Sequence, residues 1–538
     1  MGDLPDSLAK ALTHPLSVEE LVVTTHIDEL PERIGELKNL RKLEIHYAYL
    51  KQLPASFTQL EKLEILILDE ARFESFPPEI FELRNLKQLY ICSDENVEME
   101  LLPDEIALLN QLESLELACG YHSLSLQLGT LERLKELTLA YNPAAPIPDD
   151  FPFPPNVERL DLSHNQLTQL PPSISSLQKL KRLFIGGNPI RSFPKTLGQL
   201  PHLERIHLEH TALDTLEGIQ ELTALNSISL RGTPIKSLPK EITKLPALEW
   251  MDLRDCAIQS LPSGVGAWSA LKWIDLSRCG LTELPHTIKE WKTIEYLEAS
   301  HNDLRALPTG IGNWKNLKRL QMNHNRLLDF PKEIGELHAL KVLSCKHNKL
   351  VRITPAFNRL KQLQQLYLEH NQIYSASYSF PTDLSGMESL QVLKLTDNNL
   401  EEMPKGIFTL PQLKYLELRS NAIRELAGDY SRLSSLEHLD LSNNPIQALP
   451  ANFCELANLK VLHLDNTKIE DWEQTLSLLA ELPQLSSLWM RFISFEELPQ
   501  GLKKLKGLQQ MVFRRNGLPE NAYSQLREWF GETCEIHV

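Results

Sequence analysis

The chain has 538 residues, of which 42% are hydrophobic and 23% are charged, and its formal net charge is -16 at pH 7. This composition is typical of a folded protein and excludes a largely disordered one. The acidic balance argues against a nucleic-acid partner or an anionic membrane, because a protein that neutralises phosphates needs a basic face.

The seven cysteines are scattered singly and form no CxxC pair, which indicates a reducing compartment rather than a disulfide framework. The first residues are acidic and contain no apolar run that could serve as a signal peptide. No stretch approaches the roughly 18 apolar residues of a membrane span, and no N-x-S/T glycan acceptor occurs. We therefore expect a cytoplasmic protein with no membrane association. A bacterial effector delivered into a host cell would share these features.

One pattern, LxxLxLxxNxLxxLPxxIxxL, recurs along the chain, for example over residues 157–177, 317–337 and 436–456. Its period of roughly 23 residues lies in the range of leucine-rich repeats. About 22 such units can be aligned, and they cover nearly the whole chain. The alternation LxL is a period-2 signal, so Leu160 and Leu162 point to one side and Asp161 to the other. Stacked at about 4.8 Å on its neighbours, each short strand becomes one rung of a parallel sheet.

This pattern resembles the leucine-rich-repeat family, and within it the intracellular class whose units carry LPxxIGxL. That class includes Ras-binding scaffold proteins and many bacterial and plant cytosolic repeat proteins. The matching segments are Leu30-Pro31 with Ile34-Gly35, Leu307-Pro308 with Ile311-Gly312, and Phe330-Pro331 with Ile334-Gly335. The resemblance implies an α/β solenoid, a horseshoe with a concave parallel β-sheet and short irregular, 3-10 or helical convex segments.

In chain order, residues 1–24 are expected to form an N-terminal cap and a degenerate first repeat, with Glu20 in the place of a strand leucine. Residues 25–518 form the solenoid. Within it, residues 470–482 have helical spacing and predict a true helix on the convex side. Residues 519–538 form a C-terminal cap, with a helix over Pro519–Phe530 and then an edge strand.

An asparagine closes most of the strands. We expect its amide to be buried and to satisfy backbone groups at the turn, since an amide can both donate and accept hydrogen bonds. This asparagine slot is occupied by Asn165, Asn188, Asn302, Asn325, Asn348, Asn371, Asn398, Asn421 and Asn444, among others. Smaller residues, Thr211, Thr233, Thr467, Cys256 and Cys279, hold the slot elsewhere and can do part of the same work.

No phosphate loop, dinucleotide motif, HExxH or GxSxG occurs, so the sequence predicts no enzyme, no cofactor and no metal site. The triplet Cys92-Ser93-Asp94 is similar to the nucleophile motif of some bacterial ubiquitin-ligase effectors that carry leucine-rich repeats. Those ligases need a separate helical catalytic domain, for which the repeats here leave no room.

Histidines precede the asparagine slot on four successive units: His301, His324, His347 and His370. They should stack at about 4.8 Å. Two interpretations stay open: duplication of a His-Asn turn, or a pH-sensitive or metal-binding ridge. A metal site needs converging ligands, whereas such a ladder runs parallel.

The concave sheet is expected to expose an aromatic row, an acidic row beside it and arginines beyond. These residues are Trp250, Trp273, Tyr296 and Arg319; then Asp252, Asp275, Glu298 and Tyr367; then Arg231 and Arg254. Aromatic residues and arginine, rimmed by charge, are enriched at protein interfaces. The alternative is that they pack across the strands and only cover the sheet.

We therefore predict a monomeric, non-catalytic scaffold that binds another protein on its concave face. The alternative is the recognition arm of an effector, or of a ubiquitin-ligase or GTPase regulator, whose catalytic part is elsewhere. An extracellular receptor would predict a signal peptide, cysteine-clamped caps and glycan acceptors, and this sequence has none.

Overall fold

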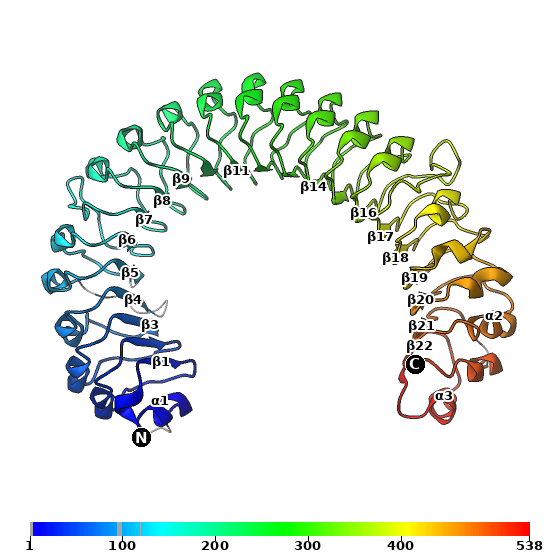
Figure 1. Cartoon of the computed structure of the whole chain (residues 1–538), viewed down its shortest axis with the longest axis horizontal. Coiled ribbons are helices and arrows are strands. Elements are labelled where there is room, and N and C mark those ends of the chain that lie inside the picture. The colour runs from blue at the N-terminus through cyan, green and yellow to red at the C-terminus, as the bar shows by residue number, and fades with distance from the viewer. Residues whose placement is uncertain (1–3, 94–98, 100, 119, 496) are drawn as a thin grey trace. The chain divides into compact units, whose positions relative to one another are not determined.

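The computed structural model describes residues 4–93, 99, 101–118, 120–495 and 497–538. Its chain divides into two compact units, Met1–Ala257 (unit 1) and Ile258–Val538 (unit 2). Within each unit the chain winds through similar coils, each made of a short strand, a turn and a return segment (Figure 1).

Unit 1 begins with the helix α1 (Asp6–Ala11), a single 3-10 turn η1 (Pro15–Ser17) and the strand β1 (Glu20–Val23). β1 pairs in parallel with β2, with Leu21 opposite Leu43 and Glu20 opposite Lys42. Leu21 is buried and Glu20 is exposed. The expected register of this first repeat is therefore wrong by one residue, because Leu21 and not Glu20 holds the strand-leucine position, and a shift of one residue exchanges the two faces of a strand.

The strands of unit 1 pair in parallel in chain order and bury their leucines on one side. After β1 they are β2 (Lys42–Ile45), β3 (Ile65–Ala71), β4 (Gln88–Ser93), β5 (Ser114–Ala118), β6 (Glu136–Thr138), β7 (Arg159–Asp161), β8 (Arg182–Phe184), β9 (Arg205–His207), β10 (Ser227–Ser229) and β11 (Trp250–Asp252).

Unit 2 repeats this arrangement, again with parallel pairing in chain order. Its strands are β12 (Trp273–Asp275), β13 (Tyr296–Glu298), β14 (Arg319–Gln321), β15 (Val342–Ser344), β16 (Gln365–Tyr367), β17 (Val392–Lys394), β18 (Tyr415–Glu417), β19 (His438–Asp440), β20 (Val461–His463), β21 (Ser487–Trp489), β22 (Gln510–Val512) and β23 (Glu535–His537).

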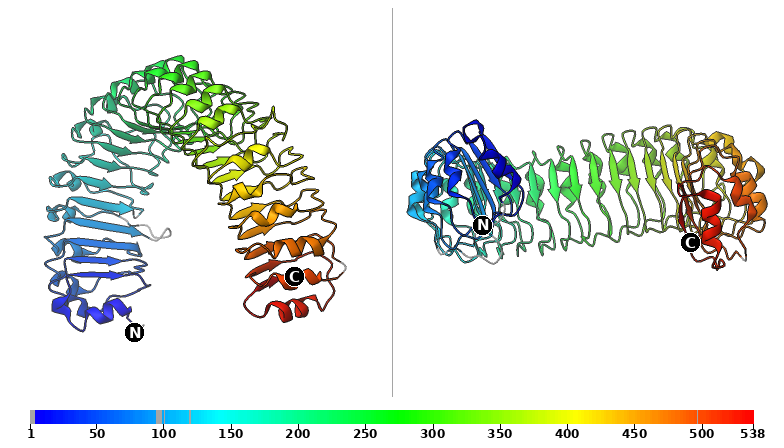
Figure 2. Two further views of the ribbon diagram at one scale, coloured as in Figure 1. Left: turned by 45° about the vertical axis from the view of Figure 1, so that its right-hand side comes forward. Right: turned by 90° about the horizontal axis from the view of Figure 1, so that it is seen from below.

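Two helices of unit 2 lie where apolar spacing predicts them. α2 (Trp472–Leu479) begins after Asp471, whose side chain accepts a hydrogen bond from the Gln474 amide at 2.8 Å. α3 (Ala522–Phe530) precedes β23, which pairs with β22 at the end of the unit (Figure 2). Among the described residues, every helix is too short or too polar to cross a bilayer.

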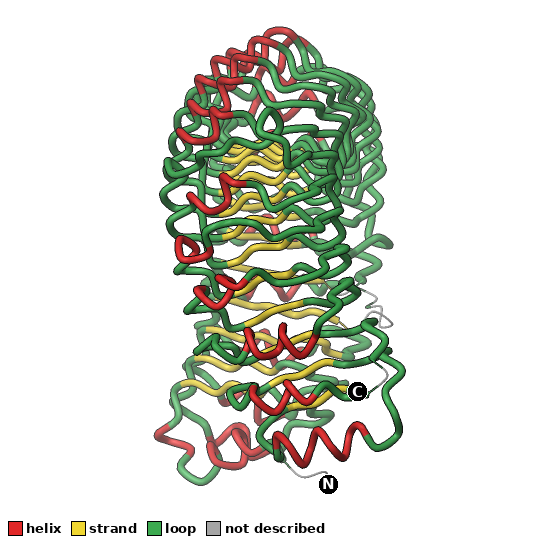
Figure 3. The backbone as a smooth tube through the Cα atoms, turned by 90° about the vertical axis from the view of Figure 1, so that its right-hand side faces the viewer, coloured by secondary structure: helices red, strands yellow, loops and turns green. Residues whose placement is uncertain are grey.

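The strands lie on the inner, concave side of each unit, and short 3-10 helices lie on the outer side (Figures 1 and 3). A proline introduces most of these helices, as Pro308 does for η13 (Thr309–Asn313). Proline has no N–H to donate to a strand ladder, and its fixed φ suits the start of a helical turn. The predicted fold class, a leucine-rich-repeat solenoid with a parallel sheet, is confirmed within each unit.

The core of unit 2 contains a column of three buried indoles, Trp268, Trp291 and Trp314. Their rings stack with centroids 6.2 and 6.3 Å apart. Each of the last two donates its Nε1–H to a carbonyl of the preceding coil, Trp291 to Val265 and Trp314 to Ile288, both at 2.8 Å. The column therefore ties neighbouring coils by hydrogen bonds as well as by packing.

The asparagine slot links each coil to the one before it. Asn302 Nδ2 donates to the carbonyl of Leu276 at 2.8 Å and to that of Ala299 at 3.0 Å, while its Oδ1 accepts from the Leu281 amide at 2.9 Å. The same donation to a preceding carbonyl is made by Asn165, Asn188, Asn325, Asn348, Asn371, Asn398, Asn421 and Asn444.

Candidate protein-binding surfaces on the strand faces

Each strand turns two side chains toward the concave side, one before and one after its buried central residue. In unit 2 the first of these rows places Trp273 opposite Tyr296, and Tyr296 opposite Arg319. The second row contains Asp275 and Glu298 and, further along, Tyr367. In unit 1, Trp250 and Asp252 hold the corresponding positions of β11, opposite Ser227 and Ser229. The repeat spacing predicts these rows.

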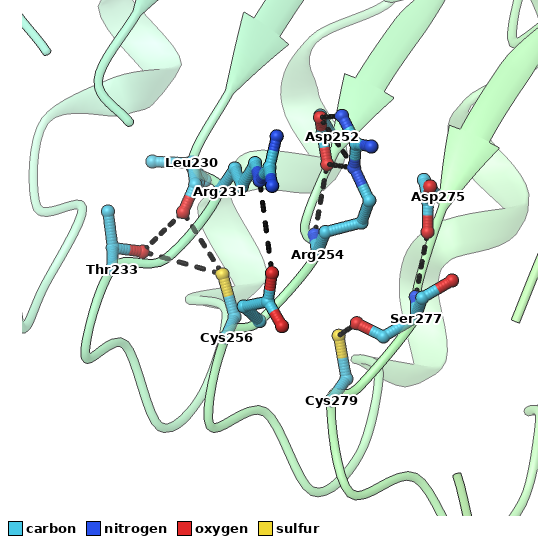
Figure 4. Close-up of polar contacts among 10 residues, drawn as sticks. Leu230, Arg231, Thr233, Asp252, Arg254, Cys256, Asp275, Ser277 and Cys279 are labelled. Atoms are coloured by element: carbon cyan, nitrogen blue, oxygen red, sulfur yellow. Dashed lines mark hydrogen bonds and ion pairs between the residues drawn. The ribbon is translucent and has the colours of Figure 1, made fainter. Parts of the chain in front are cut away.

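The acidic row is not an exposed strip, which corrects the expectation for two of its members. Asp252 is 2% exposed and Asp275 is 5% exposed. Asp252 Oδ1 accepts a hydrogen bond from the Arg254 amide at 3.0 Å, and its Oδ2 lies 2.5 Å from Arg254 Nη2. Asp275 Oδ1 accepts from the Ser277 amide at 2.8 Å. Figure 4 shows both carboxylates turned to the ends of their own strands, where a short acidic side chain readily bonds the backbone two residues on.

The aromatic row is also less exposed than expected. Trp250 and Trp273 are half-buried, and Tyr296 is 38% exposed. Packing across the strands therefore accounts for part of their surface, which was the alternative interpretation of these residues.

A strip of rings lies on the strand face of unit 1. We call Arg159, Phe184, His207 and Trp250 the unit 1 strip. The Arg159 guanidinium lies 4.7 Å from the Phe184 ring centre, and Phe184 stacks on His207 at 4.5 Å. His207 and Trp250 approach to 6.4 Å although β10 lies between their strands. This approach is possible because β10 presents only serines, Ser227 and Ser229, to this face.

A longer strip lies on the strand face of unit 2, over β16 to β21. It begins where Lys346 Nζ lies 4.7 Å from the Tyr367 ring centre. One coil further, Lys394 Nζ lies 5.1 Å from the Tyr415 ring and 2.8 Å from Glu417 Oε1. Tyr415 in turn stacks on His438 at 5.0 Å.

The strip continues through a second cluster on β20 and β21. His463 stacks on Trp489 at 4.7 Å, with an angle of 6° between the rings. The Arg491 guanidinium lies 5.0 Å from the Trp489 ring, and its Nη2 pairs with Asp465 Oδ2 at 2.7 Å. We call these half-exposed residues the unit 2 strip: Tyr367, Lys394, Tyr415, His438, His463, Trp489 and Arg491.

Lys394 stays charged, whereas the imidazoles of the unit 2 strip are neutral near pH 7. Burial alone would lower the pKa of Lys394, but the ion pair with Glu417 raises it. Burial lowers the pKa of His438 and of His463, in the second case against the opposing effect of Asp440 and Asp465. Neutral imidazoles stack on Tyr415 and Trp489 without adding charge to the face.

Glu298 gives a test of the electrostatics of this face. Its Oε1 accepts a hydrogen bond from the Ser300 amide at 3.0 Å, yet burial, and also the nearby Asp275, raise its pKa. A carboxyl with a raised pKa stabilises the fold while it is protonated, and this stability is lost as the pH rises through the folded-state pKa. Glu298→Gln should therefore raise the melting temperature relative to the wild type at about pH 7.5, and much less at about pH 3.5, below the ordinary glutamate pKa.

The matched control is Glu437→Gln, because the ion pair with Lys460 at 2.7 Å lowers the pKa of Glu437. Its substitution should lower the melting temperature at the higher pH. The burial argument would be wrong if both variants shifted the melting temperature in the same direction.

Sequence reasoning missed most of the unit 2 strip. It selected Tyr367 but not Lys394, Tyr415 or Trp489. The signal was present, because both outward rows continue from β16 to β21 once the longer coils before β17 and β21 are allowed for. It was obscured because the rings are divided between the two rows, with Tyr415 and His438 in the first and the others in the second, and so form no single aromatic column.

Two kinds of reactive site were considered from the sequence, a cysteine nucleophile and a metal site. Cys92 is half-buried on β4, and burial raises its pKa, which disfavours the reactive thiolate. Asp94, the third residue of the triplet, lies outside the described residues. Across the described ranges, no group of three or more histidine, cysteine and acidic side chains is arranged to hold a metal ion.

Comparisons with known proteins place this geometry in a family. A leucine-rich-repeat model matches residues 132–190, 155–213 and 315–373, and a model of a leucine-rich-repeat region matches residues 372–537. No curated protein sequence matches the chain.

Several solved structures share the fold. One, a leucine-rich-repeat protein of Leptospira interrogans, is 24% identical, with all of both chains covered and a TM-score of 0.52. The plant peptide hormone receptor RGFR1, solved in complex with RGF2, is 22% identical over 97% of this chain and 91% of that chain, with a TM-score of 0.63. A TDR receptor is 21% identical over 99% and 96% of the two chains, with a TM-score of 0.61. The family models, together with coils that repeat the strand, the asparagine turn and the 3-10 helix, show that the chain belongs to the leucine-rich-repeat family.

Proposed function

We propose that this chain is a non-catalytic scaffold that binds a partner protein on its strand faces. The unit 2 strip is the observation that carries the proposal. It combines tyrosine, tryptophan and arginine, the residue types that dominate binding energy at protein interfaces, and it is bordered by charged groups.

The strip is also ordered before any partner arrives. Lys394 is held against Tyr415 and Glu417, and Arg491 is held against Trp489 and Asp465. Side chains that are already fixed lose less conformational entropy on binding, so their contacts contribute more to affinity. Among the solved neighbours, RGFR1 is in complex with RGF2, and Toll is in complex with Spatzle. Solenoids of this fold therefore bind partners in those proteins.

We also propose that the protein works in the cytoplasm. Cys256, Cys279 and Cys345 are buried free thiols inside the repeats, which fits a reducing compartment.

The test is affinity capture of partner proteins with the full chain, followed by mass spectrometry. Tyr415→Ala with Trp489→Ala should abolish capture of proteins that the wild type retains, because truncating two interface anchors costs at least about 2 kcal/mol each. Trp250→Ala, assayed separately, tests the unit 1 strip.

The control is Tyr523→Ala, which removes a 46% exposed aromatic ring that lies on α3 and does not belong to the strand face. All variants should keep the wild-type circular dichroism spectrum. Undiminished capture of the same proteins by the folded double variant would show that the unit 2 strip does not bind them.

A further inference from the structure

The four histidines that precede the asparagine slot form a continuous stack on the surface of unit 2. Consecutive ring centres from His301 to His370 lie 4.2, 4.1 and 4.0 Å apart, with interplanar angles of 10 to 12°. All four side chains are exposed. Each residue has a positive φ, between 52° and 57°, which turns its side chain out at the end of the strand. We call His301, His324, His347 and His370 the histidine stack.

One end of the histidine stack already holds a carboxylate. Asp397 occupies the same position on the following coil, also with a positive φ, and its Oδ2 lies 2.7 Å from His370 Nδ1. The chain itself thus shows how a carboxylate meets the edge of this stack. The parallel rings do not converge on a common point, so they suit a row of separate acidic groups and not a metal ion.

The coils that carry the histidine stack also carry a row of exposed apolar side chains, three residues after the asparagine slot. Leu328 is 55% exposed, Val351 37% and Tyr374 42%. The coils are joined here by backbone hydrogen bonds, including that from the Val351 amide to the Leu328 carbonyl at 3.3 Å. The row therefore continues from coil to coil of unit 2, as the histidine stack does. We call it the apolar strip.

The charged groups around the stack favour an acidic ligand. Arg326 pairs with Asp303 at 2.8 Å, and Lys346 pairs with Glu369 at 2.9 Å, so each of these pairs is neutral. Lys349, between His347 and Val351, adds a positive charge, and the Asp397 carboxylate is already engaged by His370 Nδ1.

We propose that the histidine stack and the apolar strip form a second docking surface, which binds an extended acidic peptide segment with interspersed apolar residues and binds it more tightly in mild acid. This surface is separate from the strand faces, so it does not depend on the proposed scaffold function.

The pH dependence follows from the spacing of the rings. Imidazoles about 4 Å apart oppose one another's protonation, as the pKa of His347 illustrates, which is lowered first by burial and then by His370 and His324. A row of carboxylates lying along the ring edges relieves this repulsion. Binding of the peptide and uptake of protons therefore favour each other, and by linkage the affinity must increase as the pH falls.

The test uses a fluorescein-labelled peptide of three Glu-Glu-Leu repeats and the full chain, with fluorescence anisotropy at fixed ionic strength. The glutamates stay ionised at about pH 5.5, whereas histidine titrates between there and about pH 7.5. We expect about tenfold tighter binding at the lower pH, the size of an ordinary coupling between two sites. A peptide with glutamine in place of glutamate should show no such increase.

The decisive variant is His324→Asn with His347→Asn. Asparagine fits this backbone, because Asn443 and Asn466 hold the same position with φ of 55° and 50°. The variant should lose the increase at low pH. The matched control, His164→Asn with His210→Asn, changes two histidines at the equivalent position of unit 1, with φ of 58° and 54°, and should behave as the wild type.

Two further variants separate the parts of the proposal. Leu328→Ser should weaken binding at both pH values and leave their ratio unchanged. Tyr415→Ala with Trp489→Ala, which disables the unit 2 strip, should bind the peptide normally, so failure of one proposal is distinguishable from failure of the other. An unchanged pH ratio in the His324→Asn, His347→Asn variant, or no binding by the wild type at about pH 5.5, would overturn the proposal.

Discussion

Asn302→Ala is expected to destabilise unit 2 by about 3–5 kcal/mol, because a buried polar group that loses its partner costs about 1–3 kcal/mol and several lose theirs at once. The carbonyls of Leu276 and Ala299 lose a donor, and the amides of Cys279 and Leu281 lose an acceptor.

Urea unfolding of the full chain, followed by circular dichroism, measures this loss. Asn302→Thr is the matched control, since Thr467 fills the same slot and donates to the Leu464 carbonyl at 3.0 Å. It should recover part of the lost stability. A cost of Asn302→Ala below about 1 kcal/mol, the value of one ordinary hydrogen bond, would contradict this account of the slot.

The second large effect is expected for Trp314→Ala, at about 3–5 kcal/mol, which is the usual cost of truncating a buried tryptophan. Trp314 is fully buried, stacks on Trp291 at 6.3 Å and donates its Nε1–H to the Ile288 carbonyl. Its truncation therefore leaves a cavity and removes one of the two donors of the Ile288 carbonyl, which still accepts from the Trp291 amide at 3.0 Å.

Trp314→Leu separates these contributions. Leucine occupies the equivalent position after the next two 3-10 helices, as Leu337 and Leu360. This variant keeps most of the apolar packing and loses one hydrogen bond whose acceptor stays paired, so about 0.5–1.5 kcal/mol should be lost in thermal or urea unfolding. Equal losses for the alanine and leucine variants would mean that packing in the tryptophan column contributes little.

The repeat could be predicted from sequence because its determinants are periodic. A leucine pair spaced by two and an asparagine three residues later specify a strand, a buried face and a turn, and they do so many times in register. The strand register of the first repeat could not be predicted in this way. Leu21 and Glu20 are adjacent, and no preceding repeat shows which of them takes the strand-leucine position. Only the pairing with β2 resolves that ambiguity.

The candidate surface was harder to predict. The exposure of its side chains depends on local hydrogen bonds, and these do not recur with the repeat period. Asp252 and Asp275 lie on the outward side of their strands, as their spacing predicts, but each bonds the amide two residues on and becomes buried. Arg491 was missed because its contact with Trp489 joins two positions of one coil and so forms no row of equivalent positions between coils.

At the end of unit 1 the asparagine slot contains no asparagine on three successive coils, where Thr211, Thr233 and Cys256 occupy it. Asn188 makes hydrogen bonds through both Nδ2 and Oδ1, whereas the Thr211 hydroxyl donates to the Leu208 carbonyl and the Thr233 hydroxyl to the Leu230 carbonyl. A solenoid whose coils contact mainly their neighbours opens where those links are weakest. The native ensemble of unit 1 should therefore include a minor species in which the coils of β9 to β11 have come apart while those of the earlier strands remain folded. Cys256, otherwise sealed in the core, would be exposed to thiol reagents in that species.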